Sequence, residues 1–210
     1  MTEFDKKGYI VVKKAITKST ARFLYNYLLL KREVTKFLEY NKYPHVCIDT
    51  YGGFETKKDM IPGTYSLYAD IAMETLLLAI KPKIEKIIDC EVYPTYSYAR
   101  VYKQGDVLKR HKDRFSCEVS ITLLLGGNEW PIFVAKYKKI NTKGVKVDLK
   151  QGDMLIYKGC EREHWREKFK GVNSAQVFLH YNKVTTEGAE ENKYDRRPYV
   201  GIPQTYQKPK

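Results

Sequence analysis

Residues 96–125 read YSYARVYKQGDVLKRHKDRFSCEVSITLLL, and this stretch decides how the rest of the chain is interpreted. A tyrosine-rich, strand-like run enters a polar turn at Gly105, and a second strand-like run, 119–125, leaves it. Between the two runs lies His111-x-Asp113. In extended backbone, residues two apart project to the same side, so one imidazole and one carboxylate can turn toward a single point.

A third metal ligand has to come from elsewhere in the chain. His164 follows another strand-like run, 153–157, and is the candidate. Two histidines and one carboxylate leave three positions of an octahedral ion open, which is the ligand set of non-haem Fe(II) oxygenases. His-x-Asp alone is a weak motif. The neighbouring residues make a metal site more plausible, because Tyr102 precedes His111 and a glycine turn separates the two.

The composition predicts one globular domain that includes residues 1–210. The chain has 43% hydrophobic residues, which is enough for a substantial core at this length. The formal net charge of +13 and the eighteen tyrosines leave nucleic acid open as a polyanionic partner. Such lysine clusters are more often solvated faces than binding sites.

Four widely spaced cysteines form no Cys-x-x-Cys pair, so the sequence indicates neither a zinc ribbon nor a disulfide framework. We expect reduced thiols in a cytoplasmic protein. The N-terminal residues have no apolar signal core, and no apolar run reaches the roughly 18 residues of a membrane span, so no membrane partner is expected.

Residues 1–95 read as helical support with one long loop. A strand-like run, 8–15, precedes a helix over 21–40, and a second helical pattern over 64–90 is expected to split at Pro82. The loop 41–64 is a candidate lid, with His45 and Tyr51 as substrate contacts. The expected buried stripe of the first helix is Phe23, Leu24, Tyr27, Leu28, Leu30, Val34 and Leu38.

Residues 96–182 read as many short strands separated by turns, with His164 in a loop between two of them. Helices first and a closed or double sheet second predict an α+β fold with a jelly-roll core. The charged tail, 183–210, is expected to extend along the surface, with the segment 194–199 tied down.

The order of Tyr102, a glycine turn, His111-x-Asp113 and the distal His164 resembles that of Fe(II)- and 2-oxoglutarate-dependent dioxygenases, in particular the prolyl 4-hydroxylase-like branch. The resemblance implies a double-stranded β-helix core and iron held by His111, Asp113 and His164. It also implies a hydroxylase that consumes O2 and 2-oxoglutarate, releases succinate and CO2, and accepts ascorbate as a reductant. The resemblance does not identify the substrate, which could be a peptide, an amino acid or another metabolite.

The sequence departs from this family at the anchor for the distal carboxylate of 2-oxoglutarate. The family places Lys or Arg about ten residues after the distal histidine, where this chain has Asn173 and Ser174. Either a cation from another element supplies the charge that a dianion needs while Gln176 donates hydrogen bonds, or the cosubstrate is not 2-oxoglutarate; we expect the first. The candidate residues of this cosubstrate site are Arg114, Arg100, Gln176, Tyr102 and Thr122.

Period-two geometry makes one further prediction for the run after the His-x-Asp motif. Glu118, Ser120 and Thr122 should face the cavity, while the residues between them, Val119, Ile121 and Leu123, pack outward. A buried carboxylate needs a partner, so Glu118 is expected to pair with Arg110 or Arg100.

Two alternatives to a dioxygenase stay open. One is a jelly-roll metal-binding protein without 2-oxoglutarate turnover, and the other is a basic nucleic-acid-binding module. Succinate release with Fe(II) indicates the enzyme, whereas salt-dependent polyanion binding without metal indicates the nucleic-acid-binding module.

Overall fold

The computed structural model describes residues 2–43, 48–138 and 142–206. Its helices are α1 (Glu3–Lys7), α2 (Lys18–Tyr40), α3 (Ile48–Tyr51) and α4 (Ile71–Ile88), with short 3₁₀ turns η1 (Phe115–Cys117), η2 (Lys193–Arg196) and η3 (Gln204–Tyr206). Its strands are β1 (Tyr9–Val12), β2 (Gly53–Phe54), β3 (Tyr65–Tyr68), β4 (Val92–Lys103), β5 (Leu108–His111), β6 (Val119–Gly127), β7 (Ile132–Ala135), β8 (Gly144–Val147), β9 (Met154–Lys158), β10 (His164–Arg166) and β11 (Asn173–Lys183).

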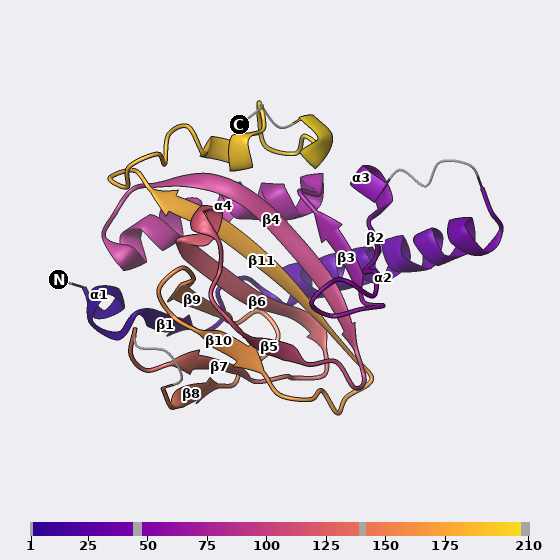
Figure 1. The fold of residues 1–210 in the computed structure, drawn as a ribbon, viewed down its shortest axis with the longest axis horizontal. Coiled ribbons are helices and arrows are strands. Elements are labelled where there is room, and N and C mark those ends of the chain that lie inside the picture. Colours follow the sequence, from indigo (N-terminus) through magenta and orange to yellow (C-terminus); the bar gives the residue numbers. More distant parts are fainter. Residues whose placement is uncertain (1, 44–47, 139–141, 207–210) are drawn as a thin grey trace.

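The strands form two antiparallel sheets (Figure 1). The larger has the order β1-β9-β6-β11-β4-β3-β2 and the smaller β5-β10-β7-β8. Helices α2 and α4 cover one face of the larger sheet, and the smaller sheet lies against the other (Figure 1). The molecule therefore has the mixed helical and antiparallel character expected from the sequence.

Two apolar clusters hold these layers together. Leu24 and Leu28 of α2 belong to the cluster that joins the helices to the larger sheet, together with Ile121 of β6. Between the sheets, Leu155 of β9 belongs to the same cluster as Val134 of β7. The site described below lies between the sheets, so both clusters support the strands that carry it.

Strand β6 confirms the predicted alternation. Val119, Ile121 and Leu123 pack into the cluster that faces the helices. Ser120 and Thr122 are buried on the opposite side and make side-chain hydrogen bonds there. Because side chains alternate along a strand, β6 brings apolar residues to the helices and hydroxyl groups to the space between the sheets.

The expectation for α2 is partly wrong. Leu24 and Leu28 are buried, but Phe23 is 68% exposed and Leu30 66% exposed. The second half of α2 extends past the edge of the sheets (Figure 1), which leaves fewer neighbours to cover a wide stripe. The buried positions instead follow a narrow line that includes Ala21 and Thr35.

The predicted break at Pro82 does not occur. Residues 65–68 form β3, and α4 then runs through Pro82 without interruption. A proline removes one backbone hydrogen bond from a helix. Here Ile80 and Ile84, on either side of the proline, are buried in the core, and this packing keeps the helix continuous.

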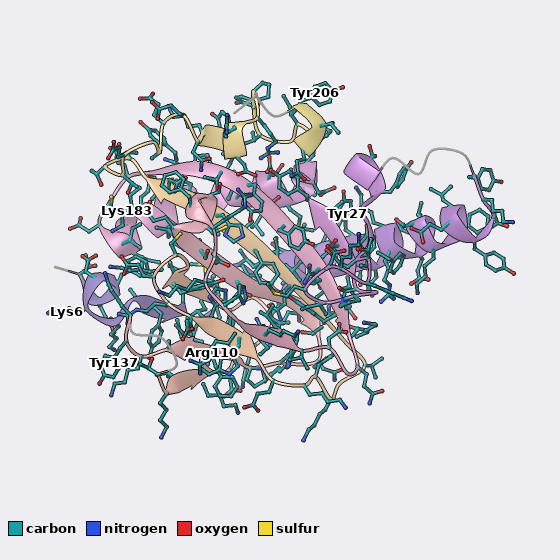
Figure 2. The ribbon with its side chains drawn as sticks, viewed as in Figure 1. Lys6, Tyr27, Arg110, Tyr137, Lys183 and Tyr206 are labelled. Atoms are coloured by element: carbon teal, nitrogen blue, oxygen red, sulfur yellow. The ribbon has the colours of Figure 1, made fainter. Side chains whose placement is uncertain are left out.

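The C-terminal segment is more than a surface extension. It runs from Lys183, at the end of β11, to Tyr206 along the upper edge of the molecule (Figure 2). Asp195 and Arg197 within it are buried. None of the described helices combines the length and apolar character needed to cross a membrane. The three described cysteines, Cys90, Cys117 and Cys160, are free thiols.

We predict that the pair formed by Glu74 of α4 and Arg197 is a main stabilising contact of this segment. Nη2 of Arg197 lies 2.7 Å from Oε1 of Glu74, and both side chains are buried. Glu74→Gln leaves a buried guanidinium without its counter-charge, which should lower the free energy of unfolding by about 3 to 5 kcal/mol in urea titrations. Glu3→Gln breaks the exposed pair with Lys7 and serves as the control. Equal midpoints for the two variants would contradict the prediction.

Candidate active site

Two histidines meet across the pairing of β5 with β10. His111 is the last residue of β5 and His164 the first of β10, and the two are direct partners in the antiparallel register. Their ring centroids lie 4.2 Å apart. His164 was expected in a loop, but it begins a strand, and this pairing is what places it beside His111.

Asp113 completes the group from the turn after β5. Its Oδ1 lies 3.5 Å from Nε2 of His111 and 3.3 Å from Nε2 of His164. Its Oδ2 accepts a hydrogen bond of 2.9 Å from the hydroxyl of Ser120. Its backbone N–H donates to the carbonyl of Gly159. A side chain at Gly159 would overlap this carboxylate, so glycine is needed there.

In both histidines, Nδ1 forms a hydrogen bond with the backbone carbonyl two residues earlier in the chain. Nδ1 of His111 donates to the carbonyl of Lys109 at 2.8 Å, and Nδ1 of His164 donates to that of Arg162 at 3.1 Å. A proton on Nδ1 leaves the lone pair on Nε2. Both Nε2 atoms therefore face Asp113 as ready metal ligands, and backbone carbonyls are the orienting partners that the sequence did not identify.

The charges of the group are strongly coupled. Burial disfavours the ionised form of Asp113, but when the imidazoles are protonated in the metal-free protein, the charge of His164 and hydrogen bonds donated by both rings hold the pKa of this carboxyl well below its usual value. Burial likewise opposes protonation of His111, yet the hydrogen bonds to Asp113 and to the carbonyl of Lys109, together with the negative charge of Asp113, outweigh burial and raise the pKa of His111.

The three side chains fit a divalent transition metal. One ligand atom from each of His111, Asp113 and His164 lies within 4.8 Å of the others. Two neutral imidazoles and a carboxylate on one side of an ion leave the opposite side for other ligands. The structure thus brings together all three residues predicted as metal ligands.

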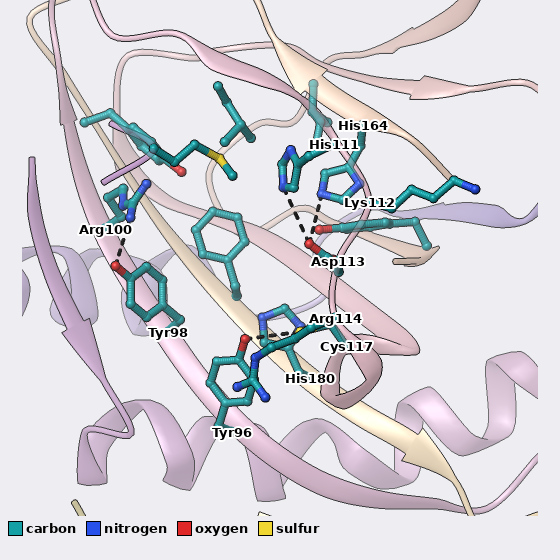
Figure 3. A pocket seen from close by; sticks show the side chains of 16 residues that line it. Tyr96, Tyr98, Arg100, His111, Lys112, Asp113, Arg114, Cys117, His164 and His180 are labelled. Atoms are coloured by element: carbon teal, nitrogen blue, oxygen red, sulfur yellow. Dashed lines mark hydrogen bonds and ion pairs between the residues drawn. The ribbon is translucent and has the colours of Figure 1, made fainter. Parts of the chain in front are cut away.

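A cavity of about 360 Å³ opens beside these ligands (Figure 3). It lies between the two sheets and reaches the surface near Met60. Besides the three ligands and Met60, its lining consists of Tyr96, Tyr98, Arg100, Tyr102, Leu108, Lys112, Arg114, Cys117, Ile132, Tyr157, Phe178 and His180.

Three of the predicted cosubstrate residues gather at or behind the deep end of this cavity. Tyr102 is buried in its wall. The hydroxyl of Thr122 lies 3.3 Å from Oε1 of Gln176. The amide of Gln176 is occupied by its neighbours, since Nε2 donates to Ser174.

The sequence interpretation missed a cation at this end. Arg166, two residues after His164 on β10, is 1% exposed, and its Nη2 donates to the hydroxyl of Thr122 at 3.2 Å. Among the described residues, no carboxylate forms an ion pair with it, and its Nε has no hydrogen-bond partner. Burial lowers its pKa to about 10, so it remains charged at neutral pH. The signal was the alternation His164-Trp165-Arg166, which puts Arg166 on the same side as the metal ligand.

The two arginines predicted as anchors line the cavity, whereas Arg166 lies behind its wall, but both of them are paired. Arg114 binds Asp195 through two contacts of 2.6 Å. Nη2 of Arg100 lies 2.9 Å from Oε1 of Glu55. These carboxylates already balance the two guanidinium charges, unlike that of Arg166.

A buried histidine forms part of the outer wall. His180 of β11 contacts the ring of Tyr96 at 4.6 Å between centroids, and its Nδ1 lies 3.0 Å from the hydroxyl of Ser120. Burial lowers the pKa of His180 to about 4, so the ring is neutral at physiological pH. The sequence gave no role to this residue.

Glu118 does not follow the prediction. Its carboxylate accepts hydrogen bonds from the hydroxyl of Thr186 at 2.8 Å and the backbone N–H of Lys183 at 3.0 Å. Arg110, one of the predicted partners, pairs with Glu163 instead. Glu118 precedes the first residue of β6, so the alternation of that strand does not extend to it.

The loop 41–64 contributes to the cavity through other residues than expected. Met60 lines it, and Glu55 holds Arg100, whereas Tyr51 is not among the lining residues. Part of this segment is ordered as α3 and β2. His45 lies outside the described residues.

Comparison with solved structures identifies proteins with a similar fold. No protein-family model and no curated protein sequence matches the chain. Among solved structures, a prolyl-4-hydroxylase from Pseudomonas putida has a TM-score of 0.59 at 13% identity, covering 86% of this chain and 95% of its own. A Trichoplax adhaerens prolyl hydroxylase, in complex with a hypoxia-inducible-factor peptide, has a TM-score of 0.61 at 13% identity, covering 91% and 88%.

A third neighbour carries a different ligand. HygX from Streptomyces hygroscopicus, with nickel, 2-oxoglutarate and hygromycin B bound, has a TM-score of 0.60 at 11% identity, covering 91% of this chain and 93% of its own. The neighbours thus differ in what they bind beside the metal. This chain has the fold shared by prolyl 4-hydroxylases and other Fe(II)- and 2-oxoglutarate-dependent oxygenases.

Proposed function

We propose that the chain is a non-haem Fe(II)- and 2-oxoglutarate-dependent oxygenase that hydroxylates a substrate and releases succinate and CO2. One observation carries the proposal: His111, Asp113 and His164 converge with both Nε2 atoms turned to one point. On this proposal residues 1–210 act as a single domain, and the two sheets form a double-stranded β-helix.

The protein groups would hold and shield the reacting components. When bound, iron and 2-oxoglutarate supply the oxidative chemistry, in which one oxygen atom of O2 enters succinate and the other the substrate. Asp113 offsets part of the metal charge. The backbone carbonyls that accept hydrogen bonds from Nδ1 of His111 and His164 keep the lone pair of each imidazole on Nε2, the ligand nitrogen. The surrounding buried side chains exclude water from the deep end of the cavity.

We assign the distal carboxylate of 2-oxoglutarate to Arg166. A fully buried cation without a counter-charge is costly, and an anion that binds beside it removes this cost. Tyr102 and Thr122 lie close enough to Arg166 to share its electrostatic environment or a hydrogen bond. Arg166 thereby takes the place that the sequence interpretation gave to Arg114 or Arg100.

Replacement of any one metal ligand should abolish the activity. His164→Ala removes one of three protein ligands, so both Fe(II) affinity and succinate formation from 2-oxoglutarate should fall by at least tenfold. Isothermal titration under anaerobic conditions and succinate detection measure the two effects. Trp165→Phe, on the opposite side of β10, is the matched control. Undiminished turnover in His164→Ala would remove the basis of the assignment.

Iron affinity should rise with pH. Because the pKa of His111 is raised in the metal-free protein, Fe(II) has to displace a proton from it at lower pH. Below that pKa the apparent association constant should increase by about tenfold per pH unit, and above it the constant should level off. Anaerobic titrations between about pH 6 and pH 8 test this sign. An affinity that falls over this range would contradict it.

The anchor assignment predicts a ranking of three arginine variants. Arg166→Met should raise the dissociation constant of 2-oxoglutarate by about ten- to a hundredfold, because a charged hydrogen bond is lost. Arg100→Met and Arg114→Met should have smaller effects, since Glu55 and Asp195 already balance these cations. Circular dichroism serves as the folding control for all three. A larger loss in Arg114→Met than in Arg166→Met would return the anchor to Arg114.

A further inference from the structure

The imidazole of His180 presents an unused nitrogen to the outer part of the cavity. The residue is 5% exposed and lines the cavity beside Tyr96 and Cys117 (Figure 3). The hydrogen bond that its ring makes to another described residue joins Nδ1 to Ser120, so Nε2 is available to a molecule in the cavity. A ring nitrogen at a cavity wall can exchange a hydrogen bond with water for one with a bound molecule.

The hydrogen bonds of Ser120 determine which kind of contact Nε2 can make. The hydroxyl lies within 3.0 Å of three groups: Oδ2 of Asp113, the carbonyl of Cys117 and Nδ1 of His180. A hydroxyl has one proton to donate, and both of the oxygens are acceptors only. The proton therefore goes to an oxygen, with the carboxylate of Asp113 the stronger acceptor. Nδ1 of His180 must then donate to Ser120, which leaves the lone pair on Nε2.

Carboxylates balance the two arginines that line the cavity. Asp195 neutralises Arg114, and Glu55 neutralises Arg100. Lys112 contributes to the rim of the cavity, and its exposed side chain extends away from the metal ligands (Figure 3). Among the described lining residues, the two arginines are therefore neutralised and Lys112 is exposed to solvent, so the wall beside His180 gives little attraction to an ionic substrate.

Partly exposed rings supply an apolar surface beside His180, since Phe178 lies two residues before it on β11 and pairs with Tyr98 of β4. Tyr98 and Phe178 are half-buried in the wall, with their ring centroids 6.4 Å apart. Tyr96, by contrast, is covered by Tyr68 and by the guanidinium of Arg114. The C–H face of a saturated ring can pack against such aromatic surfaces through dispersion and burial.

We infer that the outer part of the cavity binds an uncharged, hydroxyl-bearing ring compound of the carbohydrate or cyclitol class, with one hydroxyl donating to Nε2 of His180. The ring packs against Tyr98 and Phe178. The inference rests on the proposed function, because the bound compound is the substrate of that oxygenase.

This inference separates the chain from an enzyme that acts on peptidyl proline. A prolyl residue within a peptide has no N–H, and its ring carries no hydroxyl, so it has no donor for Nε2.

The first test uses matched probes on the iron-loaded enzyme with 2-oxoglutarate. Methyl glucopyranoside and myo-inositol present hydroxyl donors, their fully O-methylated derivatives keep the rings without donors, and N-acetyl-glycyl-prolyl-glycine amide supplies the prolyl alternative. Succinate release above the rate without probe is measured. At least one hydroxylated probe should stimulate release, and the methylated derivatives and the peptide should not. Stimulation by the peptide, or by no hydroxylated probe, would overturn the inference.

The second test is specific to Nε2. His180→Phe keeps a ring against Tyr96 but removes the acceptor, so the KM for the stimulating probe should rise by about three- to tenfold. His180→Gln restores an acceptor and should recover part of this loss. An unchanged KM in His180→Phe would show that the nitrogen makes no such contact.

Nitrogen NMR of the Zn(II)-substituted protein observes the tautomer directly. We expect Nδ1 of His180 to carry the proton and Nε2 to be unprotonated; the opposite tautomer contradicts the inference. Failure of the proposed function itself is distinguishable, because an enzyme without 2-oxoglutarate turnover would form no succinate even in the absence of a probe.

Discussion

The antiparallel register of β5 and β10 is the constraint on which the site depends. It sets His164 directly opposite His111, and a shift by one residue would turn Trp165 toward the cavity in place of His164. Two residues further on, Arg166 pairs with Leu108 after an irregularity in the register, and the alternation along β10 keeps it on the side of the metal ligands. One three-residue strand therefore carries both a metal ligand and the proposed cosubstrate anchor, and the distance between the two is set by backbone geometry.

The C-terminal segment holds the other side of the site at the cost of backbone strain. Tyr194, Asp195 and Arg196 are three consecutive residues with positive φ, a conformation that costs about 1 to 3 kcal/mol for each non-glycine residue. Asp195 is 2% exposed and accepts hydrogen bonds from Arg114, Tyr68 and Ser116. These contacts offset the strain, and they fix Arg114 next to the metal ligand Asp113.

Local pattern was sufficient to predict the pair His111 and Asp113 and the alternation of β6, because both depend on spacings of two residues, while His164 was chosen because it follows another strand-like run. It was insufficient where long-range contacts decide. The position of Arg166 beside the site follows from the pairing of β10 as a strand. Glu118 accepts a hydrogen bond from Thr186, which lies in the segment after β11. Phe23 is exposed because of where the sheets end relative to α2. The spacing of apolar residues along a helix gives no information about that position.

The distribution of charge along the cavity favours the dianion 2-oxoglutarate at one end and an uncharged substrate at the other. At the deep end Arg166 has no carboxylate partner among the described residues, whereas Glu55 balances Arg100, which lies over the ring of Tyr102, and Asp195 balances Arg114 at the outer end. A dianion therefore gains most from the deep end, where the low dielectric strengthens its attraction to the guanidinium. The outer end gives no comparable electrostatic gain and selects by shape and hydrogen bonding. If 2-oxoglutarate occupies the deep end, an uncharged substrate can follow it without competing for the same cation.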